Sequence, residues 1–164
     1  MVRRGEIQKV GRGVYRPIAA VTELDTVAAV CARVPDAIVC LLTALAIHRI
    51  GTQLPSEVWI GLDRKSRKPK IDDLPVRVVR FSGPMLTYGV EPRMIQGVAT
   101  RITTPARTVV DCFRYRNKIG IDVALEALKE SLRTRRATVD AIVRAAQVCR
   151  VHSVMSPYLE AILA

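Results

Sequence analysis

The chain is short of the residue patterns that mark the common catalytic and metal-binding sites. Its four cysteines form no CxxC pair and are spaced too widely for a zinc knuckle. Its two histidines, His48 and His152, lie far apart, and no GxSxG, HExxH or glycine-rich phosphate loop occurs. We therefore expect no catalytic residues, no metal and no cofactor, and a protein that is not an enzyme.

A long hydrophobic run is also lacking. The longest apolar stretch, residues 37–47, is much shorter than the roughly 20 residues that a transmembrane helix needs. The basic N-terminus is not followed by the apolar segment of a secretory signal. Cys31, Cys40 and Cys149 lie in apolar stretches, where a reduced thiol packs as a small hydrophobic group. These features predict a cytoplasmic protein without a membrane segment.

Positive charge is what the chain has in excess. Lys and Arg number 26 against 15 Asp and Glu, which gives a formal net charge of +11. Such a balance favours nucleic acid, an acidic protein or an anionic surface as partner, although a merely soluble basic protein is the plain alternative. The densest cluster is the stretch RKSRKPK, which contains Arg64, Lys65, Arg67, Lys68 and Lys70. We expect this cluster either to face phosphates or an acidic partner, or to be a solvated loop.

A second basic stretch, residues 112–120, places Arg114, Arg116 and Lys118 among the aromatic residues Phe113 and Tyr115. Interleaved cations and aromatic rings can bind phosphates and stack bases. At the C-terminus of a helix, the same pattern supplies apolar anchors together with cations that the helix dipole favours. We favour the second interpretation for the aromatic residues, and we count the three cations with the candidate partner or phosphate patch.

The order of elements predicts an α/β or α+β fold, with a small mixed sheet and a helical C-terminal layer. The segment GRGVYRP, residues 11–17, indicates the end of a β-hairpin. A helix is expected from Thr22 to Pro35, and one nearly all-apolar helix over 36–51, ended by Gly51. Strands are expected at 57–62 and 76–81, a short helical turn in SGPML, a hairpin turning at Gln96-Gly97, and about four helices that follow Thr104-Pro105, one of them starting at Thr138.

One enzymatic alternative depends on Glu57, Asp63 and Lys65. Carboxylates on strands beside a lysine occur in metal-dependent nucleases, where at least two carboxylates converge on a hard cation. Six residues apart on an extended strand, Glu57 and Asp63 would be roughly 20 Å from each other. A degenerate nuclease therefore remains the weaker hypothesis.

Four segments together resemble a known family. They are VPDAIVCLLTALAIHRIGTQLPSEVWIGL, VRVVRFSG, TPARTVVDCFRYRNKIGIDVALEAL and the terminal VMSPYLEAIL, and the third is the most specific. They resemble the AbiEi-type antitoxins of type IV toxin–antitoxin systems, the abortive infection family, over essentially the whole chain. In that family an N-terminal winged helix binds the promoter of its own operon, and a C-terminal α/β domain counteracts a nucleotidyltransferase toxin.

The resemblance implies that residues 3–17 are the wing of a winged helix whose preceding helices are missing. We expect residues 1–17 to be this remnant hairpin and residues 18–164 to be the antitoxin domain. Operator recognition would then be impaired, because base reading belongs to the missing helix. The wing would still offer DNA phosphates the cations Arg3, Arg4, Lys9, Arg12 and Arg16.

The sequence thus predicts a non-enzymatic antitoxin and transcriptional autoregulator that counteracts a nucleotidyltransferase toxin directly or functionally. Its basic patches would bind DNA or RNA phosphates or an acidic toxin surface. A DNA-binding repressor that works as a homodimer is a further alternative, and it predicts selective binding to its own promoter.

Overall fold

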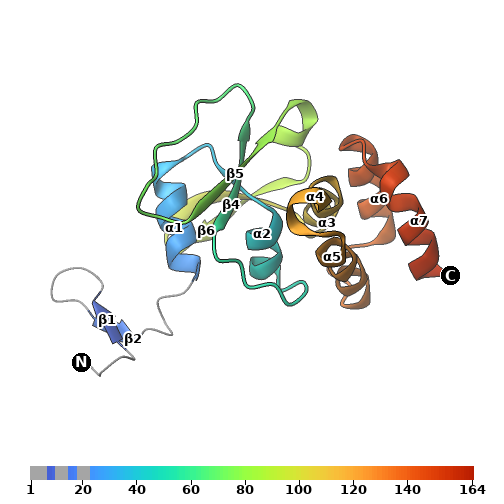
Figure 1. Cartoon of the computed structure of the whole chain (residues 1–164), viewed down its shortest axis with the longest axis horizontal. Helices are drawn as coiled ribbons and strands as arrows, with labels where there is room; N and C mark the ends of the chain where they lie inside the picture. Colours follow the sequence, from blue (N-terminus) through green and yellow to red (C-terminus); the bar gives the residue numbers. More distant parts are fainter. Residues whose placement is uncertain (1–6, 10–14, 18–22) are drawn as a thin grey trace.

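A five-stranded mixed sheet lies at the centre of the computed structural model, which describes residues 7–9, 15–17 and 23–164 (Figure 1). The strand order is β5-β4-β3-β7-β6. The central strand β3 (Ile38–Val39) is antiparallel to β4 (Val58–Asp63) and parallel to β7 (Val98–Thr103). At the edges, β5 (Val76–Phe81) runs parallel to β4, and β6 (Val90–Ile95) runs antiparallel to β7. The predicted mixed α/β fold class is confirmed.

The N-terminal strands β1 (Ile7–Lys9) and β2 (Tyr15–Pro17) pair antiparallel as a separate two-stranded sheet. Residues 10–14, where the predicted hairpin turns, lie outside the described residues, as does the predicted helix cap Thr22. The identity of this hairpin as a remnant wing, and the division of the chain at residue 17, stay predictions.

The long helix predicted over 36–51 is wrong in its first part. Ile38 and Val39 form the central strand β3, and the helix α2 (Leu41–His48) begins only after them. A short apolar run fits a buried strand and a buried helix equally well, and here two β-branched residues occupy the middle of the sheet. The helix also ends before Gly51, because Arg49 adopts a left-handed conformation (φ 59°) and the Ile50 amide donates to the Leu45 carbonyl at 2.9 Å.

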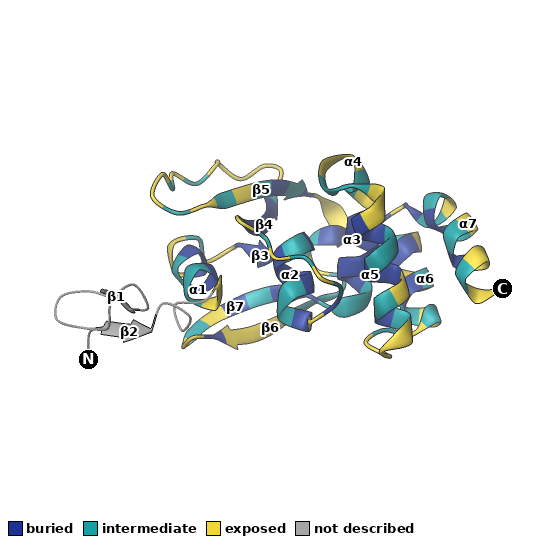
Figure 2. Cartoon of the chain, turned by 60° about the horizontal axis from the view of Figure 1, so that its bottom comes forward, coloured by how far each residue is buried: buried dark blue, intermediate teal, exposed yellow. Residues whose placement is uncertain are grey.

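Helices cover both faces of the sheet. One face packs on α1 (Glu23–Arg33), and Val58, Ile60 and Leu62 of β4 belong to the same apolar cluster as this helix. The intervening Trp59 points to the other face, where α2 and α3 (Pro105–Arg114) lie. Because β4 is covered on both sides, five of its six residues are buried (Figure 2).

The C-terminal third is helical and extends beyond one end of the sheet (Figure 1). Thr104 caps α3 by accepting a hydrogen bond from the Arg107 amide, and Thr138 caps α6 (Val139–Val148) in the same way, as predicted. The short helical turn predicted in SGPML is present as a 3₁₀ turn. The predicted hairpin turns at Gln96-Gly97, where both residues have positive φ. The remaining elements are η3 (Gly83–Leu86), α4 (Arg116–Ile119), α5 (Ile121–Arg133), α6 (Val139–Val148) and α7 (His152–Leu163). Among the described residues, no helix combines the length and apolar character needed to cross a membrane.

Candidate nucleic-acid interface

The basic cluster at 64–70 begins the connection between the two parallel strands β4 and β5. Parallel strands need a crossover of about a dozen residues, usually with a helix, but residues 64–75 form an irregular loop. All five predicted cations of this loop are exposed. Within the described residues, none of their side chains has an ion-pair or hydrogen-bond partner. Their positive charges are therefore not neutralised by ion pairs within the described residues.

The loop is held at both ends. At its start, the Lys65 amide donates to the Asp63 carboxylate at 3.0 Å, and Arg80 of β5 donates to the Asp63 and Ser66 carbonyls at 3.1 and 2.9 Å. At its other end, the Arg33 guanidinium at the end of α1 forms a two-pronged ion pair with Asp73, with Nη2 and Oδ2 2.8 Å apart. The basic stretch is thus presented between two fixed points rather than on a free tail.

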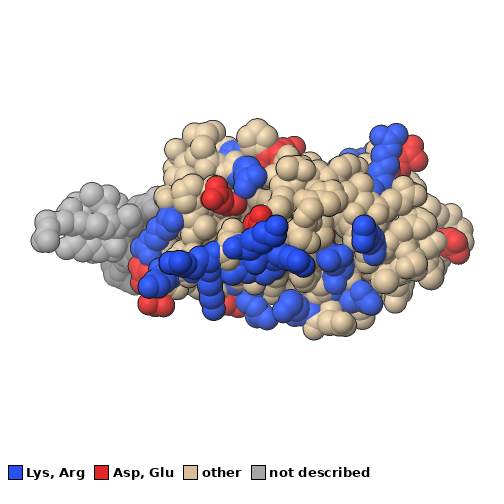
Figure 3. Space-filling view, turned by 90° about the horizontal axis from the view of Figure 1, so that it is seen from above, with Lys and Arg blue, Asp and Glu red and all other residues tan. Residues whose placement is uncertain are grey.

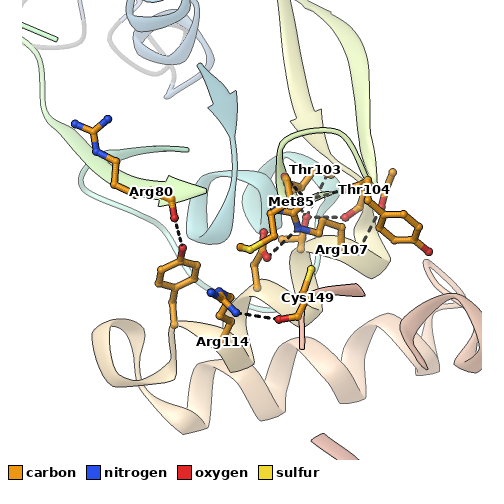
Figure 4. A network of polar contacts seen from close by, with 11 residues as sticks. Arg80, Met85, Thr103, Thr104, Arg107, Arg114 and Cys149 are labelled. Atoms are coloured by element: carbon orange, nitrogen blue, oxygen red, sulfur yellow. Dashed lines mark hydrogen bonds and ion pairs between the residues drawn. The ribbon is translucent and has the colours of Figure 1, made fainter. Parts of the chain in front are cut away.

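The second basic stretch meets the same sheet edge. The hydroxyl of Tyr115, at the end of α3, donates to the Arg80 carbonyl at 2.9 Å, and its ring lies 6.4 Å from that of Phe81. Since the Arg80 guanidinium also donates to the Ser66 carbonyl at the start of the basic loop, one arginine of β5 connects the two stretches. Figure 4 shows the hydrogen bond at the Arg80 carbonyl. The predicted stretches, far apart in sequence, are therefore neighbours in the structure.

The cations of the second stretch differ in how they are used. Arg114 donates to the Cys149 carbonyl at 2.9 Å, which ties α3 to the end of α6, and Arg116 donates to the Phe113 carbonyl at 2.9 Å. Lys118 is exposed and, among the described residues, makes no side-chain hydrogen bond or ion pair. Each arginine uses one guanidinium nitrogen for these carbonyls, so the others remain able to donate to a ligand.

Together these residues form a basic face along the β5 edge. Seen from the side on which the 64–75 loop lies, Lys and Arg side chains make a broad band across the described surface (Figure 3). We use the name "basic face" for the cations of the two predicted stretches and Arg80 between them. They are Arg64, Lys65, Arg67, Lys68, Lys70, Arg80, Arg114, Arg116 and Lys118. Such a band can bind a phosphate backbone through many weak contacts.

The aromatic residues of this stretch serve as anchors, as the sequence interpretation favoured. Phe113 is fully buried and lies 5.6 Å from the ring of Tyr158. Burial raises the pKa of Tyr115 to about 12, so its hydroxyl remains a hydrogen-bond donor at neutral pH. The buried Phe113 ring cannot stack on a base, and the half-buried Tyr115 is held by its hydroxyl, so both rings act as anchors.

Beneath the basic face lies a buried ion pair that the sequence analysis did not single out (Figure 4). Arg107 and Asp111 are both fully buried, with Nε and Oδ1 2.9 Å apart. The guanidinium also donates to the Met85 and Tyr88 carbonyls at 2.8 and 2.7 Å and lies over the Phe81 ring. Burial raises the pKa of Asp111 to about 6, an effect that Arg107 opposes. This pair fixes α3 to η3 and so positions the end of α3 that carries Tyr115.

The residues of the nuclease alternative do not converge. The Glu57 carboxylate lies 3.7 Å from Arg77, and the Asp63 carboxylate accepts from the loop backbone at Lys65. Nowhere in the described part of the chain do three or more His, Cys, Asp or Glu side chains lie together as a metal site would need. His48 is buried, with Nε2 2.7 Å from the Thr103 carbonyl oxygen, and burial lowers its pKa.

The predicted N-terminal phosphate contacts are only partly placed. Lys9 and Arg16 lie on the paired strands β1 and β2, whereas Arg3, Arg4 and Arg12 fall outside the described residues. Their role stays a prediction.

The sequence analysis did not identify one residue of the basic face. Arg80 lies in the predicted strand 76–81, and its position beside the 64–70 loop depends on the parallel pairing of β4 and β5. Only the three-dimensional arrangement reveals this residue.

Comparison with known proteins adds no relative: no protein-family model and no curated protein matches this chain.

Proposed function

We propose that this chain is the antitoxin of a type IV toxin–antitoxin system, a cytoplasmic and non-enzymatic protein that counteracts a nucleotidyltransferase toxin through its basic face. The single observation that carries the proposal is the basic face itself, in which the exposed cations of the 64–70 loop have no partner among the described residues. Uncompensated like charges repel one another, and a polyanion that binds them relieves this repulsion.

The antitoxin role comes from the sequence resemblance, and two features support it. The most specific of the resembling segments, residues 104–128, forms α3, α4 and most of α5, and it carries Arg114, Arg116 and Lys118 of the basic face. The four cysteines are free and buried, which suits the reducing interior of a cell. The proposed ligand of the basic face is the phosphate backbone of the RNA on which the toxin acts, so protein and toxin would compete for one nucleic acid.

The test is a growth-rescue assay in which a nucleotidyltransferase toxin encoded beside this chain is induced with and without it. We expect the wild-type chain to restore growth. A variant in which Arg64, Lys65, Arg67, Lys68 and Lys70 are all replaced by Glu should fail to do so while remaining folded. Rescue by this variant would show that the basic face is not used, and failure of the soluble wild-type chain would show that the antitoxin assignment is wrong.

The same proteins distinguish the proposed antitoxin from the alternative of a DNA-binding repressor. A homodimeric repressor would retard its own promoter selectively over unrelated DNA. Phosphate contacts alone predict equal, salt-sensitive retardation of both DNAs, because backbone contacts carry no sequence information.

A further inference from the structure

A second surface feature, at the opposite edge of the sheet, has a different chemistry from the basic face. A groove of about 870 Å³ lies where α1, α2 and β6 meet. The apolar residues that line it include Val27, Ala46, Ile47, Leu54, Met94 and Ile95. Leu54 is 84% exposed and Met94 is 65% exposed, and they are among the most exposed large hydrophobic residues of the described chain. Exposed apolar side chains gathered at one groove mark a contact surface more than scattered ones do.

Three arginines from three separate elements line the same groove. Arg49 follows α2, Arg93 belongs to β6, and Arg136 lies in the turn between α5 and α6. None of the three side chains forms an ion pair or hydrogen bond with a residue that the structure describes. Glu23 is the one acidic residue among those lining the groove. The groove therefore combines an apolar floor with a net positive rim.

From this combination we propose that the groove binds an acidic amphipathic helix of a partner protein. Apolar side chains on one face of such a helix would cover Leu54 and Met94, and carboxylates at its borders would pair with the three arginines. Amphipathic helices bind in grooves through apolar residues spaced three, four and seven positions apart. Complementary charge would raise the association rate and favour acidic partners over basic ones.

Other occupants fit the groove less well. An added strand is disfavoured because the edge strand β6 contains Pro92. Ile95 and Val98 flank the Gln96-Gly97 turn and form a hydrogen-bonded pair. Hydrogen-bonded and non-hydrogen-bonded pairs alternate along the ladder, so the backbone nitrogen of Pro92 faces the open edge of the sheet, where it has no N–H to donate to an added strand. The chain's own first 22 residues carry five cations and one carboxylate, so the arginines would repel them. A second copy of the chain carries the same +11 charge and is disfavoured for the same reason.

The test uses a labelled synthetic peptide of about 18 residues, with Leu on one helical face and Glu on the remaining positions. A scrambled peptide of identical composition keeps the charge but destroys the apolar face. Fluorescence anisotropy with the full chain should show at least about tenfold tighter binding of the amphipathic peptide. Leu54→Ser and Met94→Ser should each weaken that binding by about fivefold or more, without changing the thermal unfolding midpoint.

Two variants with the same change in charge separate the groove from the basic face. Replacing Arg49, Arg93 and Arg136 by Glu should abolish the preference for the amphipathic peptide. Replacing Lys65, Arg67 and Lys68 by Glu should leave the preference intact. Equal binding of the two peptides, or loss of the preference only in the loop variant, would overturn the proposal and leave the antitoxin assignment untouched.

Discussion

Arg107 and the cations of the 64–70 loop show two opposite uses of the same charge in one small domain. Arg107 is fully buried, paired with Asp111, bonded to two carbonyls and placed over an aromatic ring. The loop cations are exposed and have no partner among the described residues. The buried cation holds the fold that the exposed ones depend on, because it fixes the helix that carries Tyr115. The unpaired positive charge thus lies on the surface, whereas the buried Arg107–Asp111 pair contributes to the packing of the fold.

The largest effect is expected from breaking the buried pair. Asp111→Ala leaves the Arg107 guanidinium buried without its counter-ion and should lower the free energy of unfolding by about 3–5 kcal/mol. Denaturant unfolding followed by circular dichroism measures this loss. The control is Asp72→Ala, which removes an exposed loop carboxylate and should change stability by no more than about 0.5 kcal/mol. Equal effects of the two substitutions would contradict the structural role of the pair.

A smaller loss of stability is expected from a larger residue placed against the Phe81 ring, over which Arg107 lies. A Cβ added at Gly61 would lie 2.0 Å from a carbon of the Phe81 ring, so Gly61→Ala must displace that ring or the strand. The expected cost is about 1–3 kcal/mol. Combining Gly61→Ala with Phe81→Leu should cost less than the sum of the two single changes, because the smaller side chain makes room. Additive costs would mean that the two positions do not interact.

Removing the link between the two basic stretches should cost still less. Tyr115→Phe deletes the hydroxyl that donates to the Arg80 carbonyl and should destabilise the protein by about 1 kcal/mol. Tyr158→Phe is the matched control, because the Tyr158 hydroxyl forms no hydrogen bond with a residue that the structure describes, and it should be nearly neutral. The comparison of the two variants by thermal unfolding measures the value of this one contact.

The smallest expected effect is the contribution of His48 to the pH dependence of stability. Burial lowers the pKa of His48 below its ordinary value, so the unfolded chain takes up a proton at this residue more readily than the folded one. The contribution of His48 to stability is therefore present above its unfolded pKa of about 6.5 and declines as the pH falls below that value. The difference in stability between wild type and His48→Gln, measured from pH 8 down to pH 5, should shrink. A difference that grows over the same range would show that the folded protein favours the charged ring.

Local signals predicted the parts of the fold that local chemistry decides. Thr104-Pro105 and Thr138 are helix starts because a threonine side chain accepts from the backbone of the first turn, and Gln96-Gly97 is a hairpin turn because both residues accept positive φ. The sequence predicts a helix where Ile38 and Val39 form a strand, since an apolar run does not reveal whether its neighbours are strands.

The candidate site was predicted in its components but not in its assembly. Each basic stretch is visible as a run of cations, because charge density is a local property of a sequence. The two stretches lie side by side because Tyr115 contacts Arg80 and because β4 and β5 pair in parallel. Both interactions join residues that are distant along the chain. The burial of Arg107 is equally invisible, because an Arg–Asp pair one helical turn apart is usually an exposed pair.

The most direct measurement of the central claim is the salt dependence of binding to a labelled DNA duplex of arbitrary sequence. The slope of log K against log salt reports the number of phosphate contacts, with about 0.9 for each contact on B-form DNA. Replacing Lys65, Arg67 and Lys68 by Glu should reduce the slope by about two to three, while the matched change at Arg49, Arg93 and Arg136 should leave it unchanged. Equal slopes in the two variants would contradict the account, because binding would then depend on net charge rather than on the basic face.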